Sequence, residues 1–227
     1  GKKCGLPHEL GSTGFGVAKS TETASRLLGL NIKGATCAIH GFGNVATFAF
    51  KFLTEMGAKV VALADSKNAI FDKNGLDKTL VQKLIGEKKR LSEYPQANQI
   101  KTEDFWSLQV DILIPASVTD VVNQSNKDKI SAKIIVEGAN DPMSEEIENE
   151  FVKKGVLIVP DFVANAGGVI SSYAEYHGMS PEKMFKLVEN KIRKATEVVI
   201  KKALKTKENP RKIGMEIAKE RITQKRK

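Results

Sequence analysis

A short glycine-containing segment constrains the fold of this chain more than any other feature. Residues 41–46 read GFGNVA, directly after the apolar run Thr36–His40 and directly before residues 44–56, whose apolar side chains recur at helical spacing. A G-x-G-x-x-G/A pattern between a strand and a helix is typical of the βαβ units that bind dinucleotides. The sequence therefore predicts a dinucleotide-binding fold.

Each small residue of this motif has a physical role in such a unit. Gly41 permits a tight turn at the strand end, and Gly43 lets the backbone approach a pyrophosphate. Ala46 is small enough for the helix to pack close to the strand. The free N–H groups of the first helical turn, where Asn44 and Val45 lie, would face the phosphates.

An acidic residue is expected about twenty residues beyond the motif, where it accepts hydrogen bonds from ribose hydroxyls. Asp65 stands at that distance, immediately after the apolar run Lys59–Ala64. Capping or hydrogen bonding within its own loop is the alternative role for Asp65. An ionised Asp65 would repel a 2′-phosphate and favours NAD slightly. Ser66 and Lys67 follow at once and could instead accommodate that phosphate, so NADP stays open.

The rest of the chain alternates short aliphatic runs with amphipathic segments. The runs 110–115, 132–136 and 155–159 are almost continuously apolar, as expected for strands that are buried on both faces. Helices are predicted over residues 17–30, 44–56, 144–154 and 181–204, with a last helix from about residue 210.

This order predicts an α/β fold, a Rossmann-like doubly wound and mostly parallel sheet with flanking N- and C-terminal helices. We expect one dinucleotide-binding domain over residues 1–227. Its core would span about 34–165, and its C-terminal helices about 166–227.

Composition excludes several other classes of function. The net charge of +9 lies partly in a C-terminal tail without interleaved aromatic residues, which indicates a solvated surface and no nucleic-acid partner. No run reaches the roughly 18 apolar residues that span a bilayer, and no leader opens the chain, so we expect a cytoplasmic protein without a membrane partner. Cys4, Cys37 and the dispersed His8, His40 and His177 predict neither a disulfide framework nor a metal site.

Five segments occur in the order seen in glutamate dehydrogenases, and the resemblance covers nearly the whole chain. They are STGFG at 12–16, GFGNVA at 41–46, ADSK at 64–67, EGANDP at 137–142 and PDFVANAGGVISS at 160–172. The chain thus resembles the C-terminal dinucleotide-binding domain of a glutamate dehydrogenase, within the glutamate, leucine, phenylalanine and valine dehydrogenase superfamily. The family usually has glycine where Asp141 stands.

The resemblance implies a role for several residues around the nicotinamide end of the cofactor. Thr13 would lie near the carboxamide, Asn140 would line the cleft, and Asn165 would position the nicotinamide. Gly167 and Gly168 would let the backbone approach the ring. The residues alone also allow Thr13 and Asn140 to serve in turns or caps.

The resemblance further implies that Ala116 and Ser117 lie beside the adenosine ribose. Ser172 would help to hold the side-chain carboxylate of a glutamate substrate. The residue type also allows Ser172 to bond its own helix backbone.

The implied activity is the reversible NAD(P)-dependent oxidative deamination of L-glutamate to 2-oxoglutarate and ammonia, by an intact enzyme that is a homo-oligomer. The partners would be a dinucleotide and an amino acid. The family's catalytic lysine and aspartate belong to the preceding domain, which we expect to be absent here, so this chain has no predicted catalytic residue and should be inactive alone. The alternatives are the cofactor domain of a leucine, phenylalanine or valine dehydrogenase, or a regulatory module that binds dinucleotide without chemistry.

Overall fold

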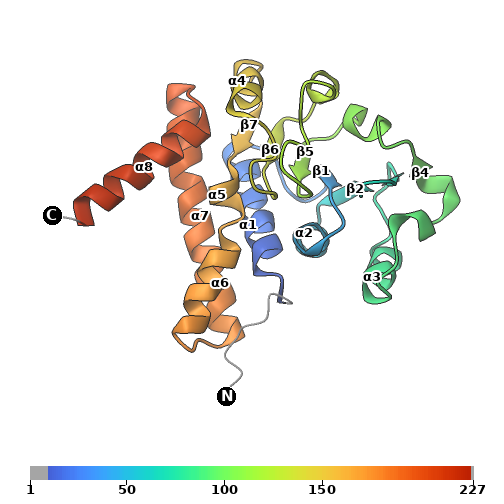
Figure 1. The fold of residues 1–227 in the computed structure, drawn as a ribbon, viewed down its shortest axis with the longest axis horizontal. Coiled ribbons are helices and arrows are strands. Elements are labelled where there is room, and N and C mark those ends of the chain that lie inside the picture. The colour runs from blue at the N-terminus through green and yellow to red at the C-terminus, as the bar shows by residue number, and fades with distance from the viewer. Residues whose placement is uncertain (1–9, 226–227) are drawn as a thin grey trace.

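A seven-stranded sheet with the order β4-β3-β2-β1-β5-β6-β7 forms the centre of the protein (Figure 1). The computed structural model describes residues 10–225, so Cys4 and His8 lie outside the described residues. The parallel part consists of β1 (Thr36–His40), β2 (Lys59–Ala64), β5 (Ile112–Pro115), β6 (Ile134–Val136) and β7 (Leu157–Val159). At one edge, β3 (Ala69–Phe71) pairs antiparallel with both β2 and β4 (Gln99–Ile100). The predicted doubly wound, mostly parallel sheet is confirmed.

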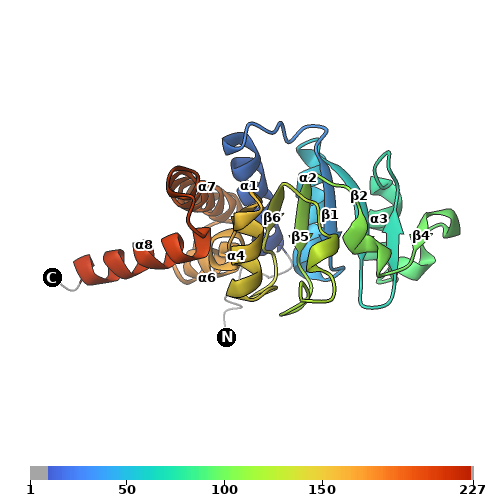
Figure 2. The ribbon, with the colours of Figure 1, turned by 90° about the horizontal axis from the view of Figure 1, so that it is seen from above.

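Helices cover both faces of this sheet, and the side chains of each strand alternate between two cores. In β5, Ile112 and Ile114 belong to one apolar cluster, whereas Leu113 belongs to the other. In Figure 2, α1 and α4 lie on opposite sides of β6. One face is covered by α1 (Ser12–Leu27), α2 (Asn44–Glu55), α3 (Lys78–Gly86) and α7 (Pro181–Thr206), and the other by α4 (Glu145–Lys153) and the 3-10 turn Asp104–Ser107. Burial on both faces explains why the strands read as continuous apolar runs.

The first helix begins earlier than the sequence pattern predicted. Helix α1 starts at Ser12 rather than near residue 17, so the STGFG stretch forms its first turns. Two glycines there let other segments approach closely. A Cβ on Gly14 would lie 2.6 Å from Phe48 Cβ, and one on Gly16 would lie 3.2 Å from the carbonyl oxygen of Ala164. Close packing therefore holds glycine-rich sequence in a helix despite its low intrinsic propensity.

Other helices match their predicted positions within a few residues. Helix α7 begins at Pro181 behind the cap Ser180, whose Oγ accepts a hydrogen bond from the backbone N–H of Lys183. Helix α8 (Pro210–Lys225) follows it. The pattern missed β3, α3 and β4, and two helices that follow β7, α5 (Asp161–Ala164) and α6 (Gly167–Tyr176). Within residues 10–225, no helix is long and apolar enough to cross a membrane.

The topology places two loops side by side at the carboxyl edge of the sheet. From β1 the chain moves to β2 on one side, and it later returns to β5 on the other side of β1. Such a change of direction separates the loops that follow two adjacent parallel strands, which leaves a crevice for ligands. Here these loops begin at Gly41 and Ala116.

We predict that Gly14→Ala lowers the free energy of unfolding by about 1–3 kcal/mol, because the new methyl group overpacks the contact between α1 and α2. Gly86→Ala is the matched control, since a Cβ there meets nothing within 4 Å. Alanine at the end of α3 should leave stability unchanged or raise it by less than about 1 kcal/mol. Urea denaturation of both variants measures the difference, and equal stabilities would contradict the close-packing argument.

Candidate functional site

The turn after β1 is closed tightly against the end of β5. Gly41 has a φ of 141°, and a Cβ there would lie only 2.5 Å from the carbonyl oxygen of Ala116. The Gly41 N–H donates to the carbonyl of Ala64 at 2.7 Å, and the Ala116 N–H donates to that of His40 at 2.8 Å. Glycine is therefore required at position 41 by both backbone conformation and space.

Helix α2 begins behind a glycine N-cap. Its N-cap residue Gly43 makes no side-chain cap hydrogen bond, and no acidic residue stands in the first turn. A Cβ on Gly43 would meet no atom within 4 Å, so this position faces open space. The N–H groups of the first helical turn have no intrahelical acceptors, and the helix dipole makes this end a favourable site for an anion.

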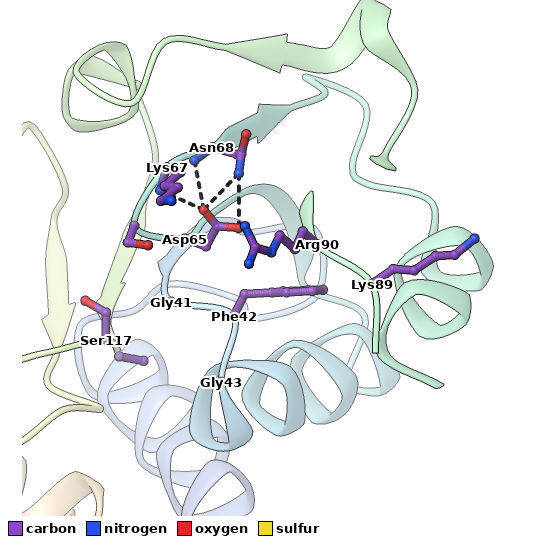
Figure 3. A pocket seen from close by; sticks show the side chains of 11 residues that line it. Gly41, Phe42, Gly43, Asp65, Lys67, Asn68, Lys89, Arg90 and Ser117 are labelled. Carbon is purple, nitrogen blue, oxygen red and sulfur yellow. Dashed lines mark hydrogen bonds between the residues drawn. The ribbon is translucent and has the colours of Figure 1, made fainter. Parts of the chain in front are cut away.

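A pocket of about 470 Å³ opens on one side of this turn (Figure 3). Six of the predicted site residues line this pocket. Gly41 and Gly43 come from the turn after β1, Asp65 and Ser66 from the turn after β2, and Ala116 and Ser117 from the loop after β5. The pocket is also lined by Lys67 and by four residues that the sequence pattern did not indicate, Phe42, Asn68, Lys89 and Arg90. Lys89 and Arg90 follow α3, a helix that the sequence pattern missed.

Asp65 has the loop role that its sequence context allowed, and it also lines the pocket. Its Oδ1 accepts hydrogen bonds from the backbone N–H groups of Lys67 and Asn68, each at 2.8 Å, so it caps the turn after β2. The same carboxylate lines the pocket. Figure 3 shows the Arg90 side chain extending toward Asp65 across Phe42, whereas Lys89 points away. Lys89 pairs with Glu87 at 2.9 Å.

A second pocket of about 570 Å³ contains the residues assigned to the nicotinamide end. Ala116 and Ser117 line both pockets, so the two adjoin at the loop after β5. The sequence-predicted residues in the second pocket are Thr13, Val45, Ala116, Ser117, Asn140, Asn165, Gly168 and Ser172. Asn44, at the start of α2, is exposed and lines neither pocket.

Two asparagines from separate loops meet in the second pocket. The Asn165 side-chain amide donates a hydrogen bond to Asn140 Oδ1 at 2.8 Å. Asp141, at the position where the family usually has glycine, has a left-handed φ of 42°, which aspartate tolerates better than most residues. Its backbone N–H donates to Asp161 Oδ2 at 3.0 Å, which fixes the turn that carries Asn140.

Helix α6 brings two further predicted residues to this pocket and turns one away. Ser172 Oγ donates to the Gly168 carbonyl at 3.2 Å, so its backbone role is present while the residue also lines the pocket. Gly167 does not line this pocket. A Cβ on Gly167 would lie 2.1 Å from the Ser12 carbonyl oxygen, so its small size is required by packing between α6 and α1.

A neutral imidazole supports the loop that the two pockets share. His40 Nδ1 lies 2.8 Å from Ser117 Oγ, and its ring stacks on Trp106 with centroids 4.6 Å apart. Burial lowers the pKa of His40 to about 4, because the charged form is poorly solvated there. The only cysteine within residues 10–225 is Cys37, a buried free thiol in β1 whose pKa is raised by burial.

Comparison with known proteins identifies relatives over almost the whole chain. The family model for Glutamate/Leucine/Phenylalanine/Valine dehydrogenase matches residues 5–227. A glutamate dehydrogenase from Aeropyrum pernix is 41% identical over 235 residues, covering 96% of this chain and 56% of that protein. An NADP-specific glutamate dehydrogenase from Saccharolobus shibatae is 38% identical over 180 residues, covering 76% of this chain and 42% of that protein.

A solved structure shows the same fold. The hetero-hexameric glutamate dehydrogenase from Thermus thermophilus superimposes with a TM-score of 0.82 at 24% identity, covering 93% of this chain and 51% of that one. The chain therefore spans about half the length of the relatives it matches.

We predict that stability falls as the pH drops from about 6.5 toward 4, in part because of His40. Its folded-state pKa lies below the unfolded value, so the unfolded chain takes up a proton first, and the full contribution exists only above about pH 6.5. His40→Phe keeps an aromatic ring but removes the titration, and should reduce the loss between pH 7 and pH 4 by about 1–3 kcal/mol. His177→Phe, on the exposed end of α6, is the control. Denaturation curves with identical pH dependence for parent and His40→Phe would refute the assignment.

Proposed function

Because the chain belongs to the Glutamate/Leucine/Phenylalanine/Valine dehydrogenase family, we propose that it binds a nicotinamide dinucleotide across the two adjoining pockets. The observation that carries this proposal is the place of the amino end of α2, where Gly43 lines one pocket and Val45 lines the other. A Cβ on Gly43 would meet no atom within 4 Å, so space is open beside the start of the helix. A pyrophosphate placed at this end would accept hydrogen bonds from N–H groups of the first helical turn, which lack intrahelical acceptors, and would gain from the helix dipole.

The two pockets fit the two halves of such a ligand. The adenosine half would lie in the pocket beside Asp65, whose carboxylate is an acceptor for ribose hydroxyls. The nicotinamide half would lie in the pocket that Thr13, Asn140 and Asn165 line, where a hydroxyl and two amides can pair with a carboxamide. The shared Ala116–Ser117 loop would lie under the link between the halves.

The bound dinucleotide would supply hydride transfer, and this chain would orient the ring. Asn165 and Asn140 already hold each other through one hydrogen bond, so their orientation is set before the ligand arrives. Gly168 lines the same pocket, where a Cβ would lie only 2.8 Å from Thr13 Oγ1, so glycine leaves room for the Thr13 hydroxyl. These groups bind and orient, and none of them is placed to move a proton in the reaction.

For the intact protein we propose the reversible oxidative deamination of L-glutamate to 2-oxoglutarate and ammonia, by a homo-oligomer. The names of the Aeropyrum and Saccharolobus relatives support this activity, and the Thermus structure, which shares the fold, is described as hetero-hexameric. Ser172 borders the nicotinamide pocket, where a hydroxyl suits a substrate carboxylate. The chain covers about half of these relatives, and the family lysine and aspartate would come from the other half. We therefore propose that this chain alone binds dinucleotide without turnover.

We further propose that the adenosine pocket accepts both NAD and NADP. An ionised Asp65 disfavours a 2′-phosphate, which supports NAD. Arg90 reaches toward Asp65 and Lys67 lines the same pocket, so cations are available for that phosphate. The two opposing influences lie within one pocket, and each can be removed separately.

We predict that Gly43→Val weakens NADH binding at least tenfold while the chain stays folded. The added side chain enters the space assigned to the pyrophosphate, and loss of hydrogen bonds to a charged group costs about 1.5–3 kcal/mol. Because the φ of Gly43 is −87° and its Cβ site is open, unfolding free energy should change by less than about 1 kcal/mol. Fluorescence titration with NADH and urea denaturation measure the two effects. Thr47→Val, one turn along α2, is the control, and parental NADH affinity in Gly43→Val would refute the pyrophosphate assignment.

We predict opposite changes in cofactor preference for two substitutions. Asp65→Asn retains an oxygen for the turn but removes the charge, and should shift the NADH-to-NADPH affinity ratio toward NADPH by about 1–3 kcal/mol. Arg90→Met should shift the ratio toward NADH, because it removes the cation that reaches the pocket. Lys89→Met, whose side chain points away from Asp65, is the matched control. Titration with both cofactors gives the ratios, and a ratio that neither Asp65→Asn nor Arg90→Met alters would show that the 2′ position lies elsewhere.

A further inference from the structure

One arginine near the C-terminus joins three separate segments beneath the nicotinamide pocket. Arg211, in the first turn of α8, contacts Glu137 through Nη2 at 2.7 Å and Glu148 through Nε at 2.6 Å. Its Nη1 lies 3.0 Å from Asp161 Oδ1. The side chains of Glu137 and Glu148 are 0% exposed, and that of Arg211 is 16% exposed. The guanidinium therefore lies in a largely dry environment, where ionic hydrogen bonds are strong and directional.

Stability of α8 does not explain this placement. The amino end of a helix favours anions, so a cation in the first turn is unfavourable for the helix itself. Figures 1 and 2 show α8 extending away from the body of the protein beyond its first turns. Asn209 strengthens the junction at that first turn, because its side-chain amide donates to Glu148 Oε2 at 3.1 Å. The arginine is thus held in position by the segment before the helix.

The carboxylates that Arg211 contacts also hold the loops of the nicotinamide pocket. The Asp161 N–H donates to Glu137 Oε2 at 2.8 Å, which joins the ends of β6 and β7. Asp161 Oδ2 accepts from the Asp141 N–H at 3.0 Å, next to Asn140. The Asp161 carbonyl accepts from the Asn165 N–H at 2.7 Å. Asn165 therefore donates its own N–H to Asp161, and Asn140 is the neighbour of Asp141, whose N–H donates to Asp161.

Arg211 supplies the positive charge that offsets a group of carboxylates in this arrangement. Glu137, Glu148 and Asp161 surround one cation, and Asp141 lies 3.5 Å from it. Burial and the neighbouring Glu148 raise the pKa of Glu137 well above its ordinary value. Buried ion pairs of this kind contribute little net stability against apolar replacements, and their best-attested use is to specify one geometry. A planar guanidinium can contact several carboxylates in fixed directions at once, which an ammonium cannot do.

We propose that Arg211 is a positioning residue, which through Glu137 and Asp161 sets the Asn140–Asn165 pair for the nicotinamide half of the cofactor. This inference rests on the proposed dinucleotide function. It assigns a contribution to cofactor geometry to the last helix, outside the strand–turn–helix motif that binds the phosphates. Arg211 itself lines neither of the two pockets and touches no part of the proposed ligand.

The test compares binding of NADH with binding of ADP-ribose, which lacks the nicotinamide. In the full chain, Arg211→Met and Arg211→Lys should each weaken NADH binding by about tenfold or more and change ADP-ribose binding by less than about twofold. Arg193→Met is the matched control, because Arg193 pairs with Glu22 at 2.8 Å and Glu189 at 2.9 Å between α1 and α7. It should alter neither affinity.

A spectroscopic measurement keeps the test decisive if Arg211→Met does not fold. In the ligand-free chain, the side-chain amide NMR signals of Asn165 and Asn140 should shift in Arg211→Lys and stay in place in Arg193→Met. Three outcomes would each overturn the positioning role. The amide signals could stay unchanged in Arg211→Lys, the Arg211 variants could lose affinity for NADH and ADP-ribose equally, or these variants could bind both ligands as tightly as the parent does. Failure of the parent to bind either ligand would instead contradict the proposed dinucleotide function, and the positioning role with it.

Discussion

The contact between the turn after β1 and the end of β5 is the constraint on which the candidate site depends. Gly41 approaches the Ala116 carbonyl so closely that a methyl group has no room, and the two strand ends are joined by backbone hydrogen bonds. This contact places the amino end of α2 beside the crevice between the loops. It also places Ala116 and Ser117 where the two pockets adjoin. A ligand that spans both pockets must therefore pass the amino end of α2.

Close helix packing extends this constraint to the far side of the cleft. Helix α1 lies against α2 through Gly14 and against α6 through Gly167, so Thr13 and Ser172 reach one pocket from separate helices. Gly14 and Gly167 serve packing between helices, whereas a Cβ on Gly43 would meet no atom within 4 Å at the edge of the first pocket. The distinction matters because a glycine-rich sequence alone does not show which glycine faces the ligand and which faces another helix.

Electrostatics differ at the two ends of the cleft. At the adenosine end, Asp65 faces solvent and Arg90, so opposing charges lie within reach of one ligand group. At the nicotinamide end, charge is buried behind the surface, where Arg211 neutralises part of a carboxylate cluster and leaves amides and hydroxyls to face the pocket. The first arrangement can select between ligands by charge. The second holds neutral polar groups in fixed orientations, which suits an uncharged carboxamide.

The sequence by itself determined the strand–turn–helix motif, the parallel strands and the position of Asp65, because these depend on local spacing and on burial of both sheet faces. It also indicated most of the residues that line the two pockets, through motifs that follow strand ends. Only the tertiary structure decided that the Arg90 side chain extends toward Asp65, that Gly167 serves helix packing, and that Arg211 contacts Asp161 next to the loops of Asn140 and Asn165. Contacts of this kind join residues far apart in the chain, such as Arg211 and Glu137, and no local pattern encodes them. In the case of Arg211, packing of the whole fold buries the carboxylates of Glu137 and Glu148 and brings this cation against them.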